Sequence, residues 1–199
     1  GILAAILLPV LGKAKDSART TQCKNNVRQL AMAVELYTAD TTGYPYLFNW
    51  NNIWFDAVAN HYASNYAIMK CPTFKGVFEP KDAILYFSGI PYLKEPTDKS
   101  VIAGVSYGYN GYGIGSADRW QSYQGDWAYL GFGALVLPWQ SYPRVKAYSV
   151  AVPSDTYLLG DTMPWPKSEN VYNYMLCINT KVMPPPDRHG GKDNIAFAD

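Results

Sequence analysis

The first forty residues predict one long helix whose two halves need different surroundings. Residues 1–12 carry no charged side chain, and no Gly or Pro interrupts residues 13–42 before Thr42-Gly43 offers a helix stop. Over residues 20–40 the less polar side chains recur three or four positions apart, which places them on one helix face. This amphipathic half can dock on its own domain, whereas the apolar half needs lipid or other copies around it. The stripe consists of Cys23, Val27, Leu30, Ala31, Val34 and Tyr37.

Three origins are open for the apolar run: a buried core helix, the remnant of a signal peptide, or the downstream half of a longer membrane helix. Twelve residues are too few to cross a bilayer, because about 30 Å of hydrocarbon needs about 20 helical residues. A signal peptide would give way to an unrelated sequence, but here the helical pattern continues. A longer membrane helix is therefore favoured over a buried core helix. Pro9 lies inside the apolar half and predicts a kink or local melting there.

Beyond residue 40, short extended runs separated by turn residues replace the helical pattern. Mixed three- and four-residue spacing between Asn49 and Ala67 predicts a second, shorter helix. Residues 110–144 are rich in Gly and aromatic side chains and predict a long ordered insertion. The fold class is α+β, with a long N-terminal α-helix (1–40) packed on the antiparallel β-sheet of one head (41–199). Strands are expected at Val101–Tyr109, Ser149–Val152, Thr156–Leu159, Val171–Ile178 and Asn194–Ala198.

Composition excludes several classes of function. With 17 Lys or Arg against 16 Asp or Glu, the net charge of +1 gives no field that attracts phosphate backbones, so we expect no nucleic-acid partner. The three cysteines lack CxxC spacing, which argues against a structural zinc site. The sequence has no GxGxxG loop that opens a helix, and we assign no catalytic residue. The chain is therefore not expected to be an enzyme.

Aromatic side chains make up 15% of the chain, while charged ones make up 17% against about 25% in an average domain. Clustered Tyr and Trp side chains can pack against neighbouring subunits, fill the core, or stack on sugars. Lateral subunit packing is the favoured interpretation, and the other two remain alternatives. The clusters are Tyr44, Tyr46, Phe48, Trp50, Trp54 and Phe55, and Trp120, Tyr123, Trp127 and Tyr129.

The sequence from Gly1 to Tyr46 resembles the N-terminal helix of type IV pilin-like proteins. It is most similar to the G-type pseudopilins of type II secretion and to a related group in planctomycetes and their relatives. Gly1 and Pro9 match the helix-breaking residues of that pattern, and the Lys-Ala-Lys, Ala-Arg and Cys-x-Asn-Asn steps lead into the amphipathic half. In the family the mature helix starts further upstream, with a methylated Phe and then a Glu. We therefore expect residues to be missing at the N-terminus.

Short elements extend this resemblance through the rest of the chain. Lys70-Cys71-Pro72, Ser106 to Gly111 and Gly160-Asp161-Thr162 resemble elements of the family. The most specific element is His189, followed after nine residues by Asp199, the spacing of a C-terminal His-x9-Asp-Gly motif. Its Gly would be the next residue, so we expect the C-terminus to be incomplete as well.

The family pattern carries cysteine at the positions of Cys23 and Cys71, which implies a disulfide between the helix and the head. Exported proteins meet oxidising conditions, and such a bridge would stabilise the fold by about 2–4 kcal/mol. Cys177 would then be the free cysteine. The alternative is that Cys23 and Cys71 are separate buried thiols.

His189 and Asp199 invite either a structural or a metal-binding interpretation. Beside the Gly190-Gly191 turn, hydrogen bonds of the two side chains could fix a hairpin, which is the favoured interpretation. Calcium is the alternative, because G-type pseudopilins are known for a calcium site in a C-terminal loop. No EF-hand spacing is present, so we assign no metal ligand and expect no cofactor. Carboxylate oxygens could come from Asp118, Asp126, Asp187, Asp193 or Asp199.

The resemblance implies a structural subunit of a type IV pilus-like or pseudopilus filament, outside the cell or at its surface. Its partners would be other copies of itself, the inner membrane that anchors it before assembly, and the pilus or type II secretion machinery. A minor pilin, or a helix-anchored module that recognises glycans or a secretion substrate, is the alternative. A secreted enzyme with a vestigial helix is a weaker one. The residues expected in the filament core are Ile2, Leu3, Ile6, Leu7, Leu8, Pro9, Val10 and Leu11.

Overall fold

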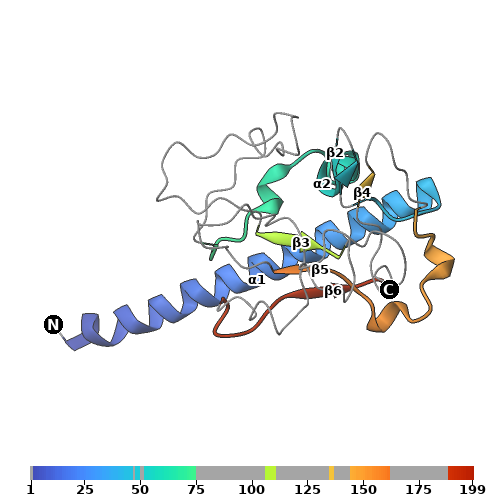
Figure 1. Cartoon of the computed structure of the whole chain (residues 1–199). Coiled ribbons are helices and arrows are strands. Elements are labelled where there is room, and N and C mark those ends of the chain that lie inside the picture. Colours follow the sequence, from blue (N-terminus) through green and yellow to red (C-terminus); the bar gives the residue numbers. More distant parts are fainter. Residues whose placement is uncertain are drawn as a thin grey trace, which may run out of the picture.

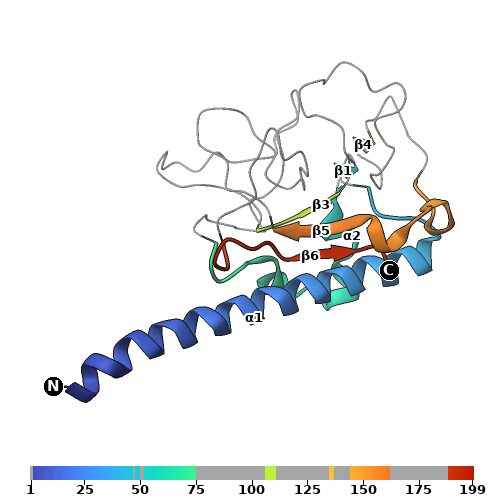
Figure 2. The same cartoon turned by 90° about the horizontal axis from the view of Figure 1, so that it is seen from below.

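A long helix, α1 (Ile2–Thr41), and a small antiparallel sheet form the described part of the computed structural model. Figures 1 and 2 show α1 running along the rest of the described chain, with its N-terminal part projecting beyond it. The predicted α+β fold is therefore confirmed. The described residues are 2–46, 48–49, 52–74, 106–110, 135–136, 144–161 and 188–199.

The helix α1 is continuous over 40 residues. Its second half is built largely from Ala, Leu, Lys, Arg, Gln and Glu, the residues with the highest helix propensity. The helix ends where the sequence predicts, because Thr42 takes a left-handed φ of 59°. The Thr41 hydroxyl donates to the Tyr37 carbonyl at 2.8 Å and so closes the last turn.

The structure contradicts the local melting predicted at Pro9, because α1 passes through this residue without interruption. Proline removes the hydrogen bond to the carbonyl four residues earlier, which here belongs to Ala5. Both residues lie on the exposed part of α1, where another donor can reach that carbonyl.

The main sheet has three antiparallel strands, and its central strand pairs on both sides. Gly160 pairs with Gly108 on one side and with Ile195 on the other. Two of the predicted strands, Thr156–Leu159 and Asn194–Ala198, are confirmed to within two residues. In sheet order the strands are β3 (Tyr107–Tyr109), β5 (Tyr157–Asp161) and β6 (Ile195–Phe197).

A second sheet of very short strands includes one parallel pair, formed by β1 and β4. This sheet was not predicted from the sequence. Its strands are, in order, β2 (Asn52–Ile53), β1 (Phe48–Asn49) and β4 (Leu135–Val136).

The second helix expected within Asn49–Ala67 is replaced by three short turns of helix. A single α-helical turn, α2 (Trp54–Ala57), precedes 3-10 helices at Ala59–Tyr62 and Tyr66–Met69. Ala63 and Ser64 take left-handed φ values of 53° and 52°, so the chain cannot continue one helix into the next.

The strand predicted at Ser149–Val152 is wrong, because Ala147–Ser149 forms a 3-10 helix. Both the backbone N–H and the hydroxyl of Ser149 donate to the Lys146 carbonyl, at 2.9 and 2.7 Å. These local bonds compete with strand pairing. The predictions for Val171–Ile178, for most of Val101–Tyr109 and for nearly all of the 110–144 insertion lie outside the described residues.

The core lies between the sheet and the second half of α1. Cys23, Val27, Leu30 and Val34 are buried, and Ala31 is partly buried, so the predicted stripe is confirmed. Each fully buried aliphatic side chain stabilises the fold by about 1.5–3 kcal/mol.

Three members of the first aromatic cluster fill the core instead of facing other subunits. Tyr44, Trp54 and Phe55 are fully buried. The Trp54 ring stacks on Tyr109 with a centroid distance of 5.5 Å. The core-filling alternative therefore holds for these residues, and the cluster from Trp120 to Tyr129 lies outside the described residues.

Gly160 is expected to tolerate no larger side chain. A Cβ at this position would lie 2.9 Å from the backbone oxygen of Asn194 and 3.2 Å from Cγ1 of Ile195. Gly160→Ala should therefore lower the free energy of unfolding by about 1–3 kcal/mol, measured by urea denaturation. The control is Gly12→Ala on α1, which meets nothing within 4 Å and should leave that value unchanged or raise it by up to about 1 kcal/mol, because Ala has the higher helix propensity. Equal stability of the two variants would contradict this packing.

Candidate functional site

The projecting half of α1 exposes a continuous apolar surface. Ile6, Leu7, Leu8, Val10 and Leu11 are each 59–69% exposed. Large exposed apolar patches on a protein mark a site of contact with other molecules. This apolar end of α1 is the strongest candidate for the functional surface.

Most residues predicted for the filament core lie on this surface. Ile2 and Leu3 belong to α1, but their side chains, like all of Gly1, lie outside the described residues. No helix in the described part of the chain is both long and apolar enough to cross a membrane.

A disulfide between Cys23 and Cys71 fastens the docked half of α1 to the head. The two Cα atoms are 5.2 Å apart, although 48 residues separate them in sequence. Both cysteines are fully buried, so the bridge is part of the core. The pairing implied by the family resemblance is therefore confirmed.

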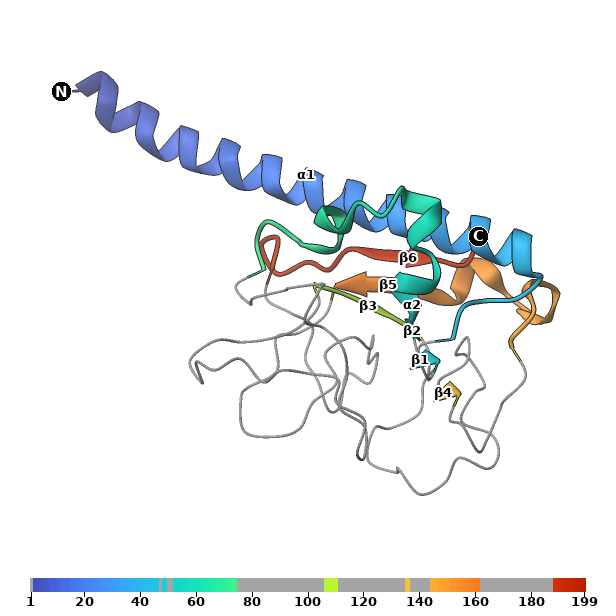
Figure 3. The same ribbon diagram turned by 90° about the horizontal axis from the view of Figure 1, so that it is seen from above.

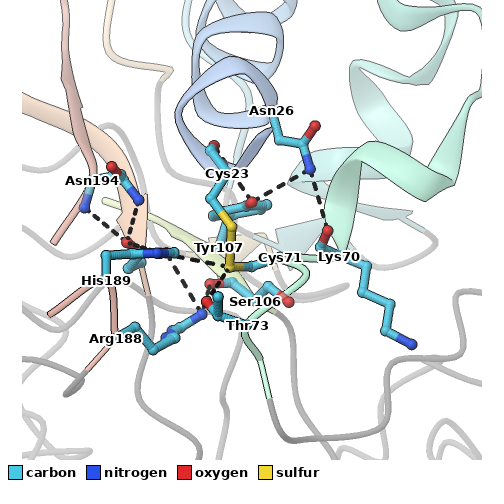
Figure 4. A network of polar contacts seen from close by, with 11 residues as sticks. Cys23, Asn26, Lys70, Cys71, Thr73, Ser106, Tyr107, Arg188, His189 and Asn194 are labelled. Carbon is cyan, nitrogen blue, oxygen red and sulfur yellow. Dashed lines mark hydrogen bonds and ion pairs between the residues drawn. A yellow bond between two sulfur atoms is a disulfide. The ribbon is translucent and has the colours of Figure 1, made fainter. Parts of the chain in front are cut away.

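A buried pair of titratable side chains lies against this disulfide (Figure 4). Nε2 of His189 is 3.6 Å from Sγ of Cys71 and 3.4 Å from Oδ2 of Asp161. The same Asp161 oxygen accepts hydrogen bonds from the backbone and side-chain N–H groups of Asn194, at 2.7 and 3.0 Å. The His189 side chain is only 1% exposed, which shows that this contact is a core feature.

Arg188 brings a third charge into the cluster. Its Nη1 lies 3.5 Å from Oδ1 of Asp161 and donates to the Ser106 carbonyl at 3.3 Å. Its guanidinium also lies over the Phe74 ring, 5.2 Å from the centroid. Burial lowers the pKa of Arg188, and the Asp161 carboxylate opposes that shift. A buried cation of this kind needs its carboxylate partner, which Asp161 supplies.

Asn26 on α1 ties two further segments to the helix. Its side-chain amide donates to the Lys70 carbonyl at 3.2 Å and to the Tyr107 hydroxyl at 3.4 Å. The Tyr107 hydroxyl in turn donates to the Cys23 carbonyl at 3.5 Å. We call the disulfide and these polar contacts the helix clamp. The residues of the clamp are Cys23, Asn26, Lys70, Cys71, Ser106, Tyr107, Asp161, Arg188, His189 and Asn194.

The clamp explains the short elements that resemble the family. The Lys-Cys-Pro, Ser-Tyr, Gly-Asp and Arg-His elements come from distant parts of the chain and meet around one disulfide. The contacts that Asp161, Arg188 and Asn26 make between these elements were not predicted from the sequence. The available signal was that Arg188 directly precedes His189 and that Asp161 directly follows Gly160 in another of these elements.

The structure does not bring His189 and Asp199 together. Among the described residues, His189 contacts Cys71 and Asp161, whereas Asp199 follows β6 beside α1. His189 therefore makes structural contacts, whereas the joint role of the two side chains in fixing a hairpin stays a prediction. His189, Gly190 and Gly191 all take left-handed φ values, from 55° to 78°, and turn the chain so that the imidazole points into the clamp.

Within the described segments, one group of three potential metal ligands comes close together: Cys23, Cys71 and His189. The disulfide uses both sulfurs, so this group cannot bind a metal as the structure stands. Calcium binding remains a prediction, because Asp118, Asp126 and Asp187 lie outside the described residues. Among the described residues, neither Asp193 nor Asp199 belongs to a group of three potential metal ligands.

Comparison with known proteins gives one partial match. The model of a family described as protein of unknown function (DUF1559) matches residues 12–48. That family is associated with pilin-like proteins in planctomycetes. The match covers less than a fifth of the 199 residues but includes the whole docked stripe of α1. No curated protein and no solved structure matches the chain.

Removing the disulfide should destabilise the docked helix. A bridge that closes a loop of 48 residues lowers the conformational entropy of the unfolded chain. In the chain-entropy model this loss stabilises the folded state by about 4 kcal/mol. The double variant Cys23→Ser/Cys71→Ser should therefore lose about 2–4 kcal/mol in urea denaturation. As a control, the unreduced, denatured wild-type chain should react with one equivalent of a thiol reagent, because one of its three cysteines is free. Three reactive thiols would contradict the bridge.

Asp161→Asn tests the buried charges of the clamp. The amide keeps the size of the side chain but leaves Arg188 without its carboxylate, which should cost about 3–5 kcal/mol of unfolding free energy. Asp155→Asn is the matched control, because Asp155 is exposed and should change stability by less than about 0.5 kcal/mol. If calorimetry gives the same unfolding temperature for both variants, the charge pairing described for Arg188 is wrong.

Proposed function

We propose that this chain is a structural subunit of an extracellular filament of the type IV pilus-like or pseudopilus kind, and not an enzyme. The observation that carries the proposal is the apolar end of α1, held away from the head with its large side chains exposed. In a filament these side chains pack against the same helices of neighbouring copies. Burying each one contributes about 1.5–3 kcal/mol, which favours assembly over isolated subunits.

The helix clamp supports the same function. It holds α1 in one orientation on the head, so every copy presents its apolar end at the same angle. A contact that repeats head to tail without closing into a ring generates a helical filament. A rigid helix is therefore what a regular fibre requires.

The proposal includes a stage before assembly. The apolar end of α1 then lies in the lipid of the inner membrane, and the pilus or secretion machinery transfers it to the growing filament. The transfer exchanges lipid for neighbouring helices, so the apolar side chains are not left in water at either stage. The partial match to a family associated with pilin-like proteins supports this interpretation.

Leu7→Asp in the native gene should abolish filaments, because it places an unpaired carboxylate among apolar helices. Leu7→Met keeps the side chain apolar and similar in volume and should leave filaments intact. Electron microscopy of sheared surface material measures filaments, and thiol labelling checks that the Cys23–Cys71 bridge still forms in both variants. Normal fibres from Leu7→Asp would refute the proposal. Wild-type material that carries this chain only at fibre tips would favour the minor-pilin alternative.

A further inference from the structure

An open groove of about 780 Å³ lies between the docked half of α1 and β6, which run side by side (Figure 3). Met32 and Leu36 on its helix wall are 49% and 54% exposed. Exposed apolar side chains that line a groove mark a surface on which another molecule docks. The apolar lining consists of Val27, Ala31, Met32, Leu36, Ile195, Ala196 and Phe197.

One end of this groove carries two carboxylates, Glu35 on α1 and Asp199 after β6. Burial raises the pKa of Glu35, and the nearby Asp199 raises it further. Oε1 of Glu35 is buried without a hydrogen-bond partner, and no ion pair in the described part of the chain includes either residue. The groove therefore presents an acidic end to which a cationic group would bind.

The exposed part of α1 has the complementary chemistry. Its apolar end is followed by Lys13 and Lys15, and every residue from Ala5 to Ser17 is exposed. Ile6, Val10 and Lys13 are spaced four and then three residues apart, so they share one helix face. Arg28, Met32 and Glu35 show the same spacing on the wall of the groove.

Equal spacing fixes a register between two parallel copies of α1. An offset of 22 residues, or about 33 Å, places Lys13 beside Glu35 and Val10 beside Met32. Ile6 then lies beside Arg28, whose apolar stem can cover it. An antiparallel helix with Lys13 at Glu35 would carry Val10 past the end of the groove, so the parallel arrangement is the one that fills it.

We infer that this groove receives the face of α1 formed by Ile6, Val10 and Lys13 of a second copy, with Lys13 beside Glu35 and Asp199. The inference rests on the proposed filament and specifies one contact within it. The carboxylates of Glu35 and Asp199 then bind a cationic side chain of another subunit and not one of their own chain.

Cross-linking tests the register directly. The whole chain carrying Val10→Cys and Met32→Cys, expressed in its native host, should give a ladder of multimers on a non-reducing gel after mild oxidation, because each copy links to two others. Either single variant should give no ladder. These controls show whether cross-links through Cys177 contribute to the multimers. Absence of filaments in the wild type would refute the proposed function itself. Wild-type filaments without the ladder would overturn the contact alone.

A charge exchange tests the acidic end. Lys13→Glu and Glu35→Lys should each lower the amount of filament at least about tenfold, and the double variant should restore it. Lys15 lies on another helix face, so Lys15→Glu combined with Glu35→Lys should not be rescued. Normal filaments from both single variants would overturn the inference. The inference would also be overturned if the filaments dissolve in a chelator and the chain with Val10→Cys and Met32→Cys gives no ladder. A metal cation, and not Lys13, would then bind Glu35 and Asp199.

Glu35→Gln separates assembly from folding. The folded chain raises the pKa of Glu35, so ionising this carboxylate destabilises the fold as the pH rises through that pKa. The variant should therefore unfold at a higher temperature than the wild type at pH 7, and the difference should vanish below the usual pKa of 4.5. The same variant should form fewer filaments. A variant that is more stable yet assembles as well as the wild type would overturn the inference.

Discussion

The attachment of α1 to the head is the interaction on which the rest of the structure depends. A helix of 40 residues buries one stripe over its second half and leaves its first half exposed. The disulfide to Cys71 and the contacts of Asn26 secure the middle of the helix, where the docked half begins. Without this attachment the apolar end could fold back on the head. With it, the apolar end stays exposed on the subunit, and in the proposed filament other copies cover it.

The clamp also shows how distant sequence elements share one role. Asp161 at the end of β5 receives hydrogen bonds from Asn194, lies beside His189, and faces Arg188. Three titratable groups are thus buried beside a disulfide, an arrangement that in another setting would suggest catalysis. Here Asp161, Arg188 and His189 each contact another segment of the chain, and the cluster lies in the core. These contacts join the segments that hold α1 on the head.

The sequence predicted the features that local periodicity determines. The docked stripe and the stop at Thr42 follow from helical spacing and turn chemistry, and both are confirmed. The Cys23–Cys71 pairing came from family resemblance alone, because no local rule joins residues 48 positions apart. Asp161 and His189 were not paired for the same reason.

The strand predicted at Ser149–Val152 does not form, because hydrogen bonds to the Lys146 carbonyl produce a 3-10 turn that strand propensity does not anticipate. The groove between α1 and β6 could not be predicted either, because it exists only once β6 lies beside α1.

In the proposed filament, other copies of this chain cover the apolar end of α1. Cryo-electron microscopy of native fibres, with helical reconstruction, can locate this part of the helix. We expect the apolar ends of α1 to pack together along the fibre axis, with the heads on the outside. A reconstruction in which the heads form the axis and the N-terminal half of α1 faces solvent would contradict it. So would a monomeric protein in which that half lies against its own head.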